Sequence, residues 1–190
     1  MTRRYELKKR AERQAQTRQR IVEAAVALHT TVGPARTSIS AIAKQAGVQR
    51  HTVYAHFPDE PALFRACSAH WEATHPAPDS ALWSGIADPQ GRLQRALEAV
   101  YGWYDEVGND IERFVRDAPI SPTTAAQWDR WESELRQTAD SLAAPLGGSR
   151  VVRAAVGHAL AFETWRSLVR REGLTKPQAV RAMLSFVESV

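Results

Sequence analysis

Apolar residues recur along this chain at spacings of three and four, the spacing of amphipathic helices. Glycine and proline mark the breaks between these segments, for example at Gly33-Pro34, at Gly108 and at 145–148. Residues typical of helix N-caps follow several breaks, namely Ser38, Asp59, Asp88 and Thr175. No segment shows the alternation of a strand. We therefore predict an all-α protein of about nine helices.

The segment Thr37 to Phe57, TSISAIAKQAGVQRHTVYAHF, predicts two short helices joined by a glycine turn. Gly47 can adopt the left-handed conformation that ends the first helix. Val53 and Phe57 supply the buried side of the second helix. The first helix has one apolar face, formed by Ile39, Ile42, Ala43 and Ala46. These sizes and spacings predict a helix-turn-helix, a motif that binds DNA.

The second of these helices leaves a polar face free to contact another molecule. Arg50 can form a bidentate pair with guanine in the major groove, and Thr52 can contact a base or a thymine methyl. Tyr54 and His56 lie near the end of the helix, where a phosphate is the expected partner. Each residue could instead be an incidental surface residue. The predicted DNA-binding residues are Ser38, Lys44, Gln49, Arg50, His51, Thr52, Tyr54 and His56.

This region resembles the DNA-binding domain of the tetracycline-repressor (TetR) family. The matching pieces are RIVEAAVALHTTVG, TSISAIAKQAGVQRHTVYAHF and a helix that begins at Pro58 and carries Leu63 and Phe64. Together they cover roughly a quarter of the chain. The resemblance implies a homodimeric, all-helical transcriptional regulator whose larger C-terminal domain binds a small molecule. It also implies phosphate contacts at Tyr54 and His56.

Three residues depart from the usual pattern of that family. Gln49 stands where a Ser or Thr cap is usual, and His51 stands where a small residue is common. Glu60 replaces a lysine that usually contacts phosphate, and a carboxylate beside DNA is repulsive. Gln49 can read adenine, and His51 places bulk in the groove. We therefore expect an operator sequence peculiar to this protein.

The basic charge of the chain is concentrated in its first third. Residues 1–60 hold 11 Lys or Arg against 5 Asp or Glu, whereas the whole chain carries a net charge of +4. Such a segment could bind a polyanion, or it could be a solvated helix face. Together with the helix-turn-helix, the basic charge favours DNA as the binding partner. The N-terminal run could reach along DNA or be a disordered tail. It contains Arg3, Arg4, Lys8, Lys9, Arg10, Arg13, Arg18 and Arg20.

The six tryptophans all follow the predicted DNA-binding segment. Large rigid rings can line a cavity for a flat, apolar or cationic ligand, or they can fill a core that has no cavity. We predict a ligand site, and its candidate residues are Trp103, Tyr104, Trp128, Trp131, Phe162 and Trp165.

The last two predicted helices span 150–171 and 175–190. The first carries small and large apolar residues on two faces, which suits a core and a dimer interface at once. The second begins with a capping box of Thr175 and Gln178. The resemblance implies that both helices form a four-helix interface with a second copy. The predicted domains are a basic arm (1–16), a DNA-binding domain (17–58) and a ligand-binding and dimerisation domain (59–190).

Other classes of protein are disfavoured by the residues. A single cysteine, Cys67, excludes an internal disulfide, and its neighbours His70 and His75 form only a weak metal pattern. No nucleophile and base pattern indicates an enzyme, and no cofactor or metal is expected. The longest nearly apolar run, 154–162, is too short for a membrane helix, and no secretory signal is expected. The expected location is the cytoplasm.

The predicted function is that of a repressor released from a two-fold operator by a small, aromatic or apolar effector. Effector binding could tilt the helix at 59–74 and change the distance between the two recognition helices. The alternative is a DNA-binding regulator without an effector, whose C-terminal domain serves only dimerisation. Activation in place of repression stays open, because the sign of regulation depends on where the operator lies relative to a promoter.

Overall fold

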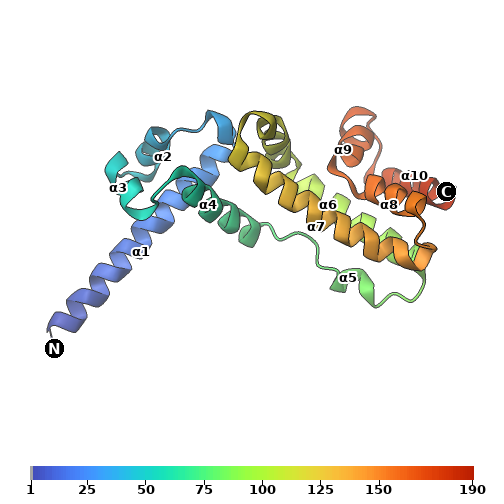
Figure 1. The fold of residues 1–190 in the computed structure, drawn as a ribbon, viewed down its shortest axis with the longest axis horizontal. Coiled ribbons are helices and arrows are strands. Elements are labelled where there is room, and N and C mark those ends of the chain that lie inside the picture. Colours follow the sequence, from blue (N-terminus) through green and yellow to red (C-terminus); the bar gives the residue numbers. More distant parts are fainter. Residues whose placement is uncertain (1) are drawn as a thin grey trace. The chain divides into compact units, whose positions relative to one another are not determined.

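The computed structural model describes residues 2–190, with side chains from residue 5 onward. Ten α-helices and no strand occur in this range (Figure 1), which confirms the all-α prediction. Arg3 and Arg4, two members of the basic N-terminal run, have side chains outside the described part. No helix between residues 2 and 190 is both long and apolar enough to cross a membrane.

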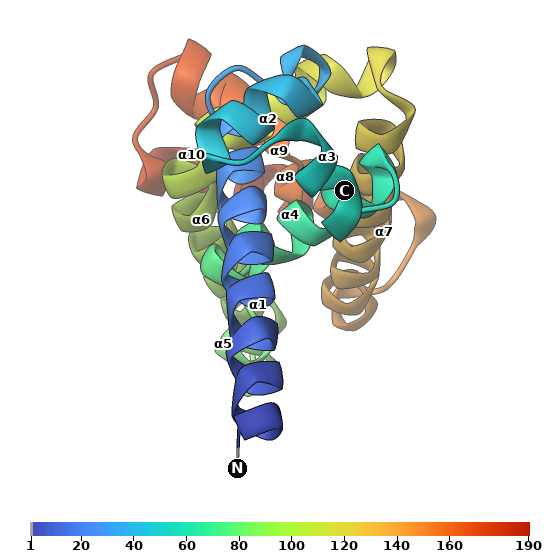
Figure 2. The same cartoon turned by 90° about the vertical axis from the view of Figure 1, so that its left-hand side faces the viewer.

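The first compact unit comprises Met1–Pro76 and Glu112–Ala125. Its elements are α1 (Thr2–His29), the 3-10 turn η1 (Pro34–Arg36), α2 (Ile39–Ala46), α3 (Arg50–His56), α4 (Glu60–Thr74), the end of α6, the 3-10 turn η2 (Ala118–Ile120) and the start of α7. Figure 2 shows α2, α3 and α4 grouped around the C-terminal half of α1. Ile21 and Ala25 of α1 are fully buried there, in one core with Ile42, Val53 and Leu63.

The second compact unit comprises Ala77–Ile111 and Ala126–Val190. Its elements are α5 (Ala81–Ser84), most of α6 (Pro89–Asp117), most of α7 (Pro122–Ala143), the 3-10 turn η3 (Ala144–Leu146), α8 (Arg150–Leu160), α9 (Phe162–Trp165), the π-helical segment η4 (Arg166–Arg171) and α10 (Lys176–Glu188). The two units are defined by the compactness of the backbone and not by function. The functional boundaries at 16/17 and 58/59 stay a prediction.

Four helix starts predicted from the sequence are confirmed by hydrogen bonds. Ser38 Oγ accepts from Ala41 N at 3.1 Å, Asp59 Oδ1 from Ala62 N at 2.7 Å, Asp88 Oδ2 from Gly91 N at 2.7 Å, and Thr175 forms the capping box with Gln178. Each of these bonds satisfies a backbone N–H at the first turn of a helix, which has no partner within the helix itself.

Helix α6 runs without interruption from Pro89 to Asp117, so the predicted break at Gly108 is wrong. Glycine costs a helix interior only about 1 kcal/mol relative to alanine, and packing can offset that cost. A Cβ at Gly108 would lie 2.6 Å from the ring of Trp165. The missing side chain therefore lets the Trp165 indole lie directly on the backbone of α6. The indole N–H donates to Asp105 Oδ1 at 3.1 Å.

The predicted single helix at 150–171 is also wrong. Helix α8 ends at Leu160, and Ala161 has the extended angles φ −63° and ψ 142° before α9 begins. The apolar residues assigned to two faces of one helix thus belong to separate elements. Val156 is buried on α8, whereas Phe162 and Trp165 are buried on α9.

Two tyrosines of α6 satisfy carbonyl groups at this break. Tyr101 donates its hydroxyl hydrogen to Ala159 O at 2.8 Å, and Tyr104 donates to Leu160 O at 2.9 Å. Burial raises the pKa of both tyrosines, so that both hydroxyls keep their protons at neutral pH. The last carbonyls of a helix lack partners within it, so these two bonds stabilise the interruption.

Removal of either hydroxyl should destabilise the protein. We expect Tyr101→Phe and Tyr104→Phe each to lower the free energy of unfolding by about 1–3 kcal/mol, because each leaves a buried carbonyl without its donor. Denaturation in urea, followed by circular dichroism, measures the change. Tyr5 is 65% exposed, so Tyr5→Phe is the matched control. Unchanged stability in both buried variants would contradict this role.

Candidate nucleic-acid interface

The turn between α2 and α3 follows from a glycine and a small set of apolar residues. Gly47 has φ 65°, the left-handed conformation, and its N–H bonds to the last carbonyls of α2. The N–H of Val48 then bonds to Ala43 O at 3.0 Å, which closes the turn. Val53 and Phe57 are 1% and 3% exposed, so they fix which side of α3 faces the core. The predicted helix-turn-helix is present.

The predicted DNA-binding residues lie along the outside of this motif. Thr52 and His56 are half-buried, and the others are exposed: Ser38, Lys44, Gln49, Arg50, His51 and Tyr54. Ser38 also caps α2, whereas Gln49 precedes α3 without a side-chain cap, as its departure from Ser or Thr indicates. Contact with DNA by each of these residues stays a prediction.

The exposed side of α3 includes one residue outside the predicted DNA-binding set. Ala55 lies one helical turn after His51 and is exposed. A small apolar residue carries no charge or hydrogen-bonding group, so nothing in its side chain signals a role. If α3 enters the major groove as predicted, a methyl side chain at this position would let the helix approach a base edge closely and would suit a thymine methyl.

Arg50 and Tyr54 contact each other on the exposed face of α3. Arg50 Nη2 donates to the Tyr54 hydroxyl oxygen at 3.2 Å, and the guanidinium carbon lies 5.6 Å from the ring centroid. The two residues are four positions apart, so they are neighbours on the helix surface. The Arg50 side chain, which is predicted to read a base, thus lies against both the ring and the hydroxyl of Tyr54.

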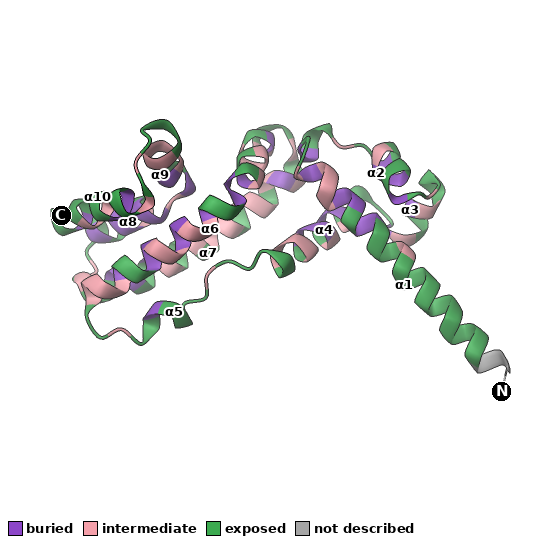
Figure 3. Ribbon diagram, turned by 180° about the vertical axis from the view of Figure 1, so that it is seen from behind, coloured by how far each residue is buried: buried purple, intermediate pink, exposed green. Residues whose placement is uncertain are grey.

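The basic run at the N-terminus forms part of helix α1. Lys8, Lys9, Arg10 and Arg13 are exposed on this helix, whose N-terminal half is coloured as exposed in Figure 3. Arg18, farther along, stacks on the ring of Phe57 at the end of α3, with 4.7 Å between the guanidinium carbon and the ring centroid. The described backbone of the run is therefore helical. Its contact with phosphate stays a prediction.

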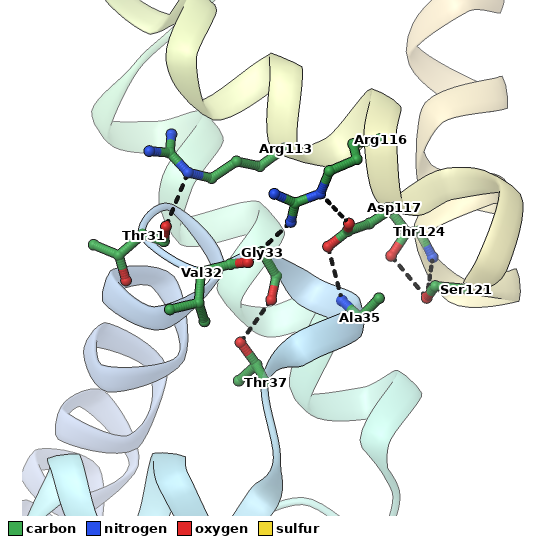
Figure 4. Close-up of polar contacts among 10 residues, drawn as sticks. All are labelled: Thr31, Val32, Gly33, Ala35, Thr37, Arg113, Arg116, Asp117, Ser121 and Thr124. Carbon is green, nitrogen blue, oxygen red and sulfur yellow. Dashed lines mark hydrogen bonds and ion pairs between the residues drawn. The ribbon is translucent and has the colours of Figure 1, made fainter.

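The linker between α1 and α2 is held by the end of α6, all within the first unit (Figure 4). Asp117 is 1% exposed, and its Oδ2 accepts the N–H of Ala35 at 3.0 Å. Its Oδ1 accepts from Arg116 Nε at 2.7 Å, and Arg116 Nη2 donates to Val32 O at 2.9 Å. Arg113 donates to Thr31 O at 3.0 Å. We call these contacts of Arg113, Arg116 and Asp117 the α6 clasp.

Gly33 is required where the clasp meets the linker. Its φ of 98° is rarely adopted by residues with a side chain, and a Cβ there would collide with Arg116 and Asp117. Burial by itself raises the pKa of Asp117. The hydrogen bonds from Arg116 and Ala35, with the charges of Arg116 and Arg36, outweigh it and lower that pKa overall. Asp117 is therefore a carboxylate at neutral pH.

A sequence model described as "Bacterial regulatory proteins, tetR family" matches residues 21–67. Residues 21–67 are therefore similar to the DNA-binding part of tetR-family regulators. The matched residues contain the end of α1, the whole helix-turn-helix and the first half of α4. The fold is that of a DNA-binding transcriptional regulator.

Solved structures of TetR-like proteins share the fold over nearly the whole chain. A TetR-like transcriptional regulator from Rhodococcus sp. RHA1 is 23% identical, with a TM-score of 0.60 over 90% of this chain and 93% of its own. NalD of Pseudomonas aeruginosa, the secondary repressor of the MexAB-OprM multidrug efflux pump, is 17% identical, with a TM-score of 0.63 over 93% and 96%. At these identities the likeness concerns the fold alone. No curated protein sequence matches the chain.

Cys67 forms part of the core of the first compact unit. Its Sγ lies 3.3 Å from His29 Nδ1. Burial raises the pKa of Cys67 to about 12 and lowers that of His29 to about 4, so both side chains are neutral at neutral pH. Within the described residues no group of three or more His, Cys, Asp or Glu side chains could hold a metal ion.

Loss of the Asp117 charge should loosen the clasp. We expect Asp117→Asn to lower the stability of the first compact unit by about 1–3 kcal/mol at pH 7, since charge-assisted bonds to Arg116 and Ala35 are weakened. A lowered folded pKa contributes stability above the unfolded value of 3.8, and this contribution is lost as the pH falls below it. The difference from wild type should therefore shrink below pH 3.8.

Thermal unfolding measured from pH 7 to pH 3 checks this expectation. Asp140 is exposed on α7, so Asp140→Asn is the matched control and should stay within about 0.5 kcal/mol of wild type. A pH-independent difference for Asp117→Asn would show that the ionised carboxylate is not what holds the linker.

Proposed function

We propose that the protein binds a two-fold DNA operator as a homodimer and is released from it by a small, aromatic or apolar effector. The observation that carries the DNA-binding part is the orientation of α3. Val53 and Phe57 are buried, whereas Arg50, His51 and Tyr54 are exposed. A short helix presented in this way suits the major groove of DNA.

Exposed apolar residues on α8 and α10 support the proposed dimer. Val151 on α8 is 58% exposed and Phe186 on α10 is 40% exposed, and the two helices pack together in the second unit. Because the predicted helix at 150–171 is interrupted, the proposed interface now uses α8 (Arg150–Leu160) with α10 (Lys176–Glu188). For both copies of α3 to enter successive major grooves, a dimer must place them about 34–36 Å apart.

The predicted ligand residues lie in one aromatic cluster of the second unit. Trp131 is central to its half-buried part: its ring centroid lies 4.9 Å from that of Trp128, 6.0 Å from that of Trp103 and 6.2 Å from that of Tyr104. Tyr104 in turn contacts Phe162 and Trp165 at 5.3 and 5.6 Å. Three indoles gathered at partial exposure favour a flat aromatic or apolar effector.

The alternative is a regulator without an effector. Tyr104, Phe162 and Trp165 are at most 1% exposed and pack on one another, as residues of a core do. We favour an effector because Trp103, Trp128 and Trp131 are only half-buried. An indole left partly in water gains by covering its face with an apolar ligand.

Helix α6 offers a route from the effector to DNA. It carries Trp103 and Tyr104 of the aromatic cluster, and it ends in the α6 clasp on the linker before α2. An effector that prefers one arrangement of α6 would raise the population of the helix-turn-helix arrangement that goes with it. NalD, which shares the fold, is a repressor. We propose the same sign of regulation here, with action on DNA in the cytoplasm.

Arg50→Ala should remove sequence preference and leave general DNA binding. Selection from random duplexes first defines the operator, and affinities for operator and for unrelated DNA are then measured at several salt concentrations. We expect operator affinity to fall about 5- to 150-fold, the value of one bidentate pair with guanine. Affinity for unrelated DNA should change far less.

Arg95 lies on α6 in the second unit, so Arg95→Ala is the matched control for the loss of one positive charge. Its operator affinity should equal that of wild type. If specific binding survives Arg50→Ala and Thr52→Ala together, the assignment of the reading face is wrong. If selection yields no preferred sequence at all, the proposed function itself fails.

Trp131→Ala should abolish the response to an effector while operator affinity without effector is retained. A panel of neutral arenes, aromatic acids and small apolar compounds is titrated into the operator complex. At least one compound should weaken operator binding about 5- to 150-fold, the usual range of allosteric coupling. Trp71→Phe, in the first unit, should respond as wild type does. Equal operator affinity with every compound would favour the regulator without an effector.

A further inference from the structure

Tyr54 is placed to do more than contact the DNA backbone. Long side chains on a helix lean toward its N-terminus, so the ring of Tyr54 covers the turn that begins at Arg50. The hydrogen bond of 3.2 Å and the ring contact at 5.6 Å both join the same guanidinium to the same phenol. Two kinds of contact therefore restrict one exposed arginine.

We propose that Tyr54 is a specificity-determining residue that positions the Arg50 guanidinium for guanine while its own hydroxyl donates to a DNA phosphate. This inference rests on the proposed function, in which α3 enters the major groove. It changes the role of Tyr54, because a residue that only contacts phosphate cannot alter which base Arg50 prefers.

The chemistry of the two groups permits both contacts at once. A guanidinium has five N–H donors, and the bond to Tyr54 uses one hydrogen of Nη2. The other hydrogen of Nη2 and both hydrogens of Nη1 stay available for a bidentate pair with guanine. The phenol oxygen accepts from Arg50 through a lone pair and keeps its own hydrogen. Tyr54 is 41% exposed, so that hydrogen can reach a phosphate oxygen.

Preorganisation is the physical benefit of this arrangement. A free arginine on an exposed helix face samples many rotamers, and all but one of them are lost when it pairs with a base. Holding Arg50 against Tyr54 before binding removes part of that loss. The benefit applies only where guanine is present to pair with Arg50. It therefore raises the affinity for the operator relative to the affinity for an operator in which that guanine is replaced.

The test is a double-mutant cycle on the full-length protein with Arg50→Ala, Tyr54→Phe and both together. Tyr54→Phe keeps the ring and removes only the hydroxyl. The probes are the selected operator duplex and the same duplex with the guanine recognised by Arg50 replaced by adenine. We expect Tyr54→Phe to reduce the affinity ratio between these duplexes about three- to tenfold, the value of one hydrogen bond.

In the Arg50→Ala background the same Tyr54→Phe change should leave the ratio unaltered, while it still weakens both duplexes equally through the lost phosphate contact. A thermal midpoint equal to wild type for Tyr54→Phe establishes that the change acts on recognition and not on folding.

Three outcomes would overturn the inference. Equal weakening of both duplexes by Tyr54→Phe, with Arg50 present, would leave Tyr54 as a phosphate contact only. A gain in operator affinity would mean that Tyr54 withholds Arg50 from DNA. A ratio that is insensitive to Arg50→Ala would overturn the assignment of Arg50 in the proposed function, and with it the role of Tyr54. The first two results leave that proposed function intact.

Discussion

A buried carboxylate holds together the unit that carries the helix-turn-helix. An ionised side chain that is 1% exposed is tolerated only when its oxygens are hydrogen-bonded. Asp117 meets this condition through Arg116 and the N–H of Ala35, and Arg116 and Arg113 bond in turn to the carbonyls of Val32 and Thr31 in the linker after α1. The linker that enters α2 is therefore fixed by the end of α6, and the placement of α2 and α3 depends on it.

Two glycines make room for close contacts with residues of α6 or on its backbone. At Gly108 the missing side chain makes room for the ring of Trp165, and at Gly33 it makes room for Arg116 and Asp117 of α6. The first contact belongs to the aromatic cluster and the second to the linker of the helix-turn-helix. Both contacts involve residues of α6, the helix that we propose couples effector binding to DNA binding.

The helix-turn-helix was predictable from the sequence almost residue by residue. Ser38, Gly47, Val53 and Phe57 have the roles expected of them, because capping, a left-handed turn and an apolar face are properties of residues within one or two turns. The aromatic cluster was predicted as a set, and its six members do lie together. The contact of Arg50 with Tyr54 was not predicted, although their spacing of four was a sufficient signal.

The sequence by itself determined the helical class, the helix starts and the DNA-binding motif, since each rests on local hydrogen bonds and local periodicity. Only the tertiary structure decided that α6 continues through Gly108 and that the chain breaks at Ala161. The hydroxyls that satisfy the carbonyls at this break come from Tyr101 and Tyr104, 58 and 56 residues earlier in the chain. The α6 clasp likewise joins residues 82 positions apart. Partners so distant in sequence leave no periodic signal, because what selects them is the fold that brings them together.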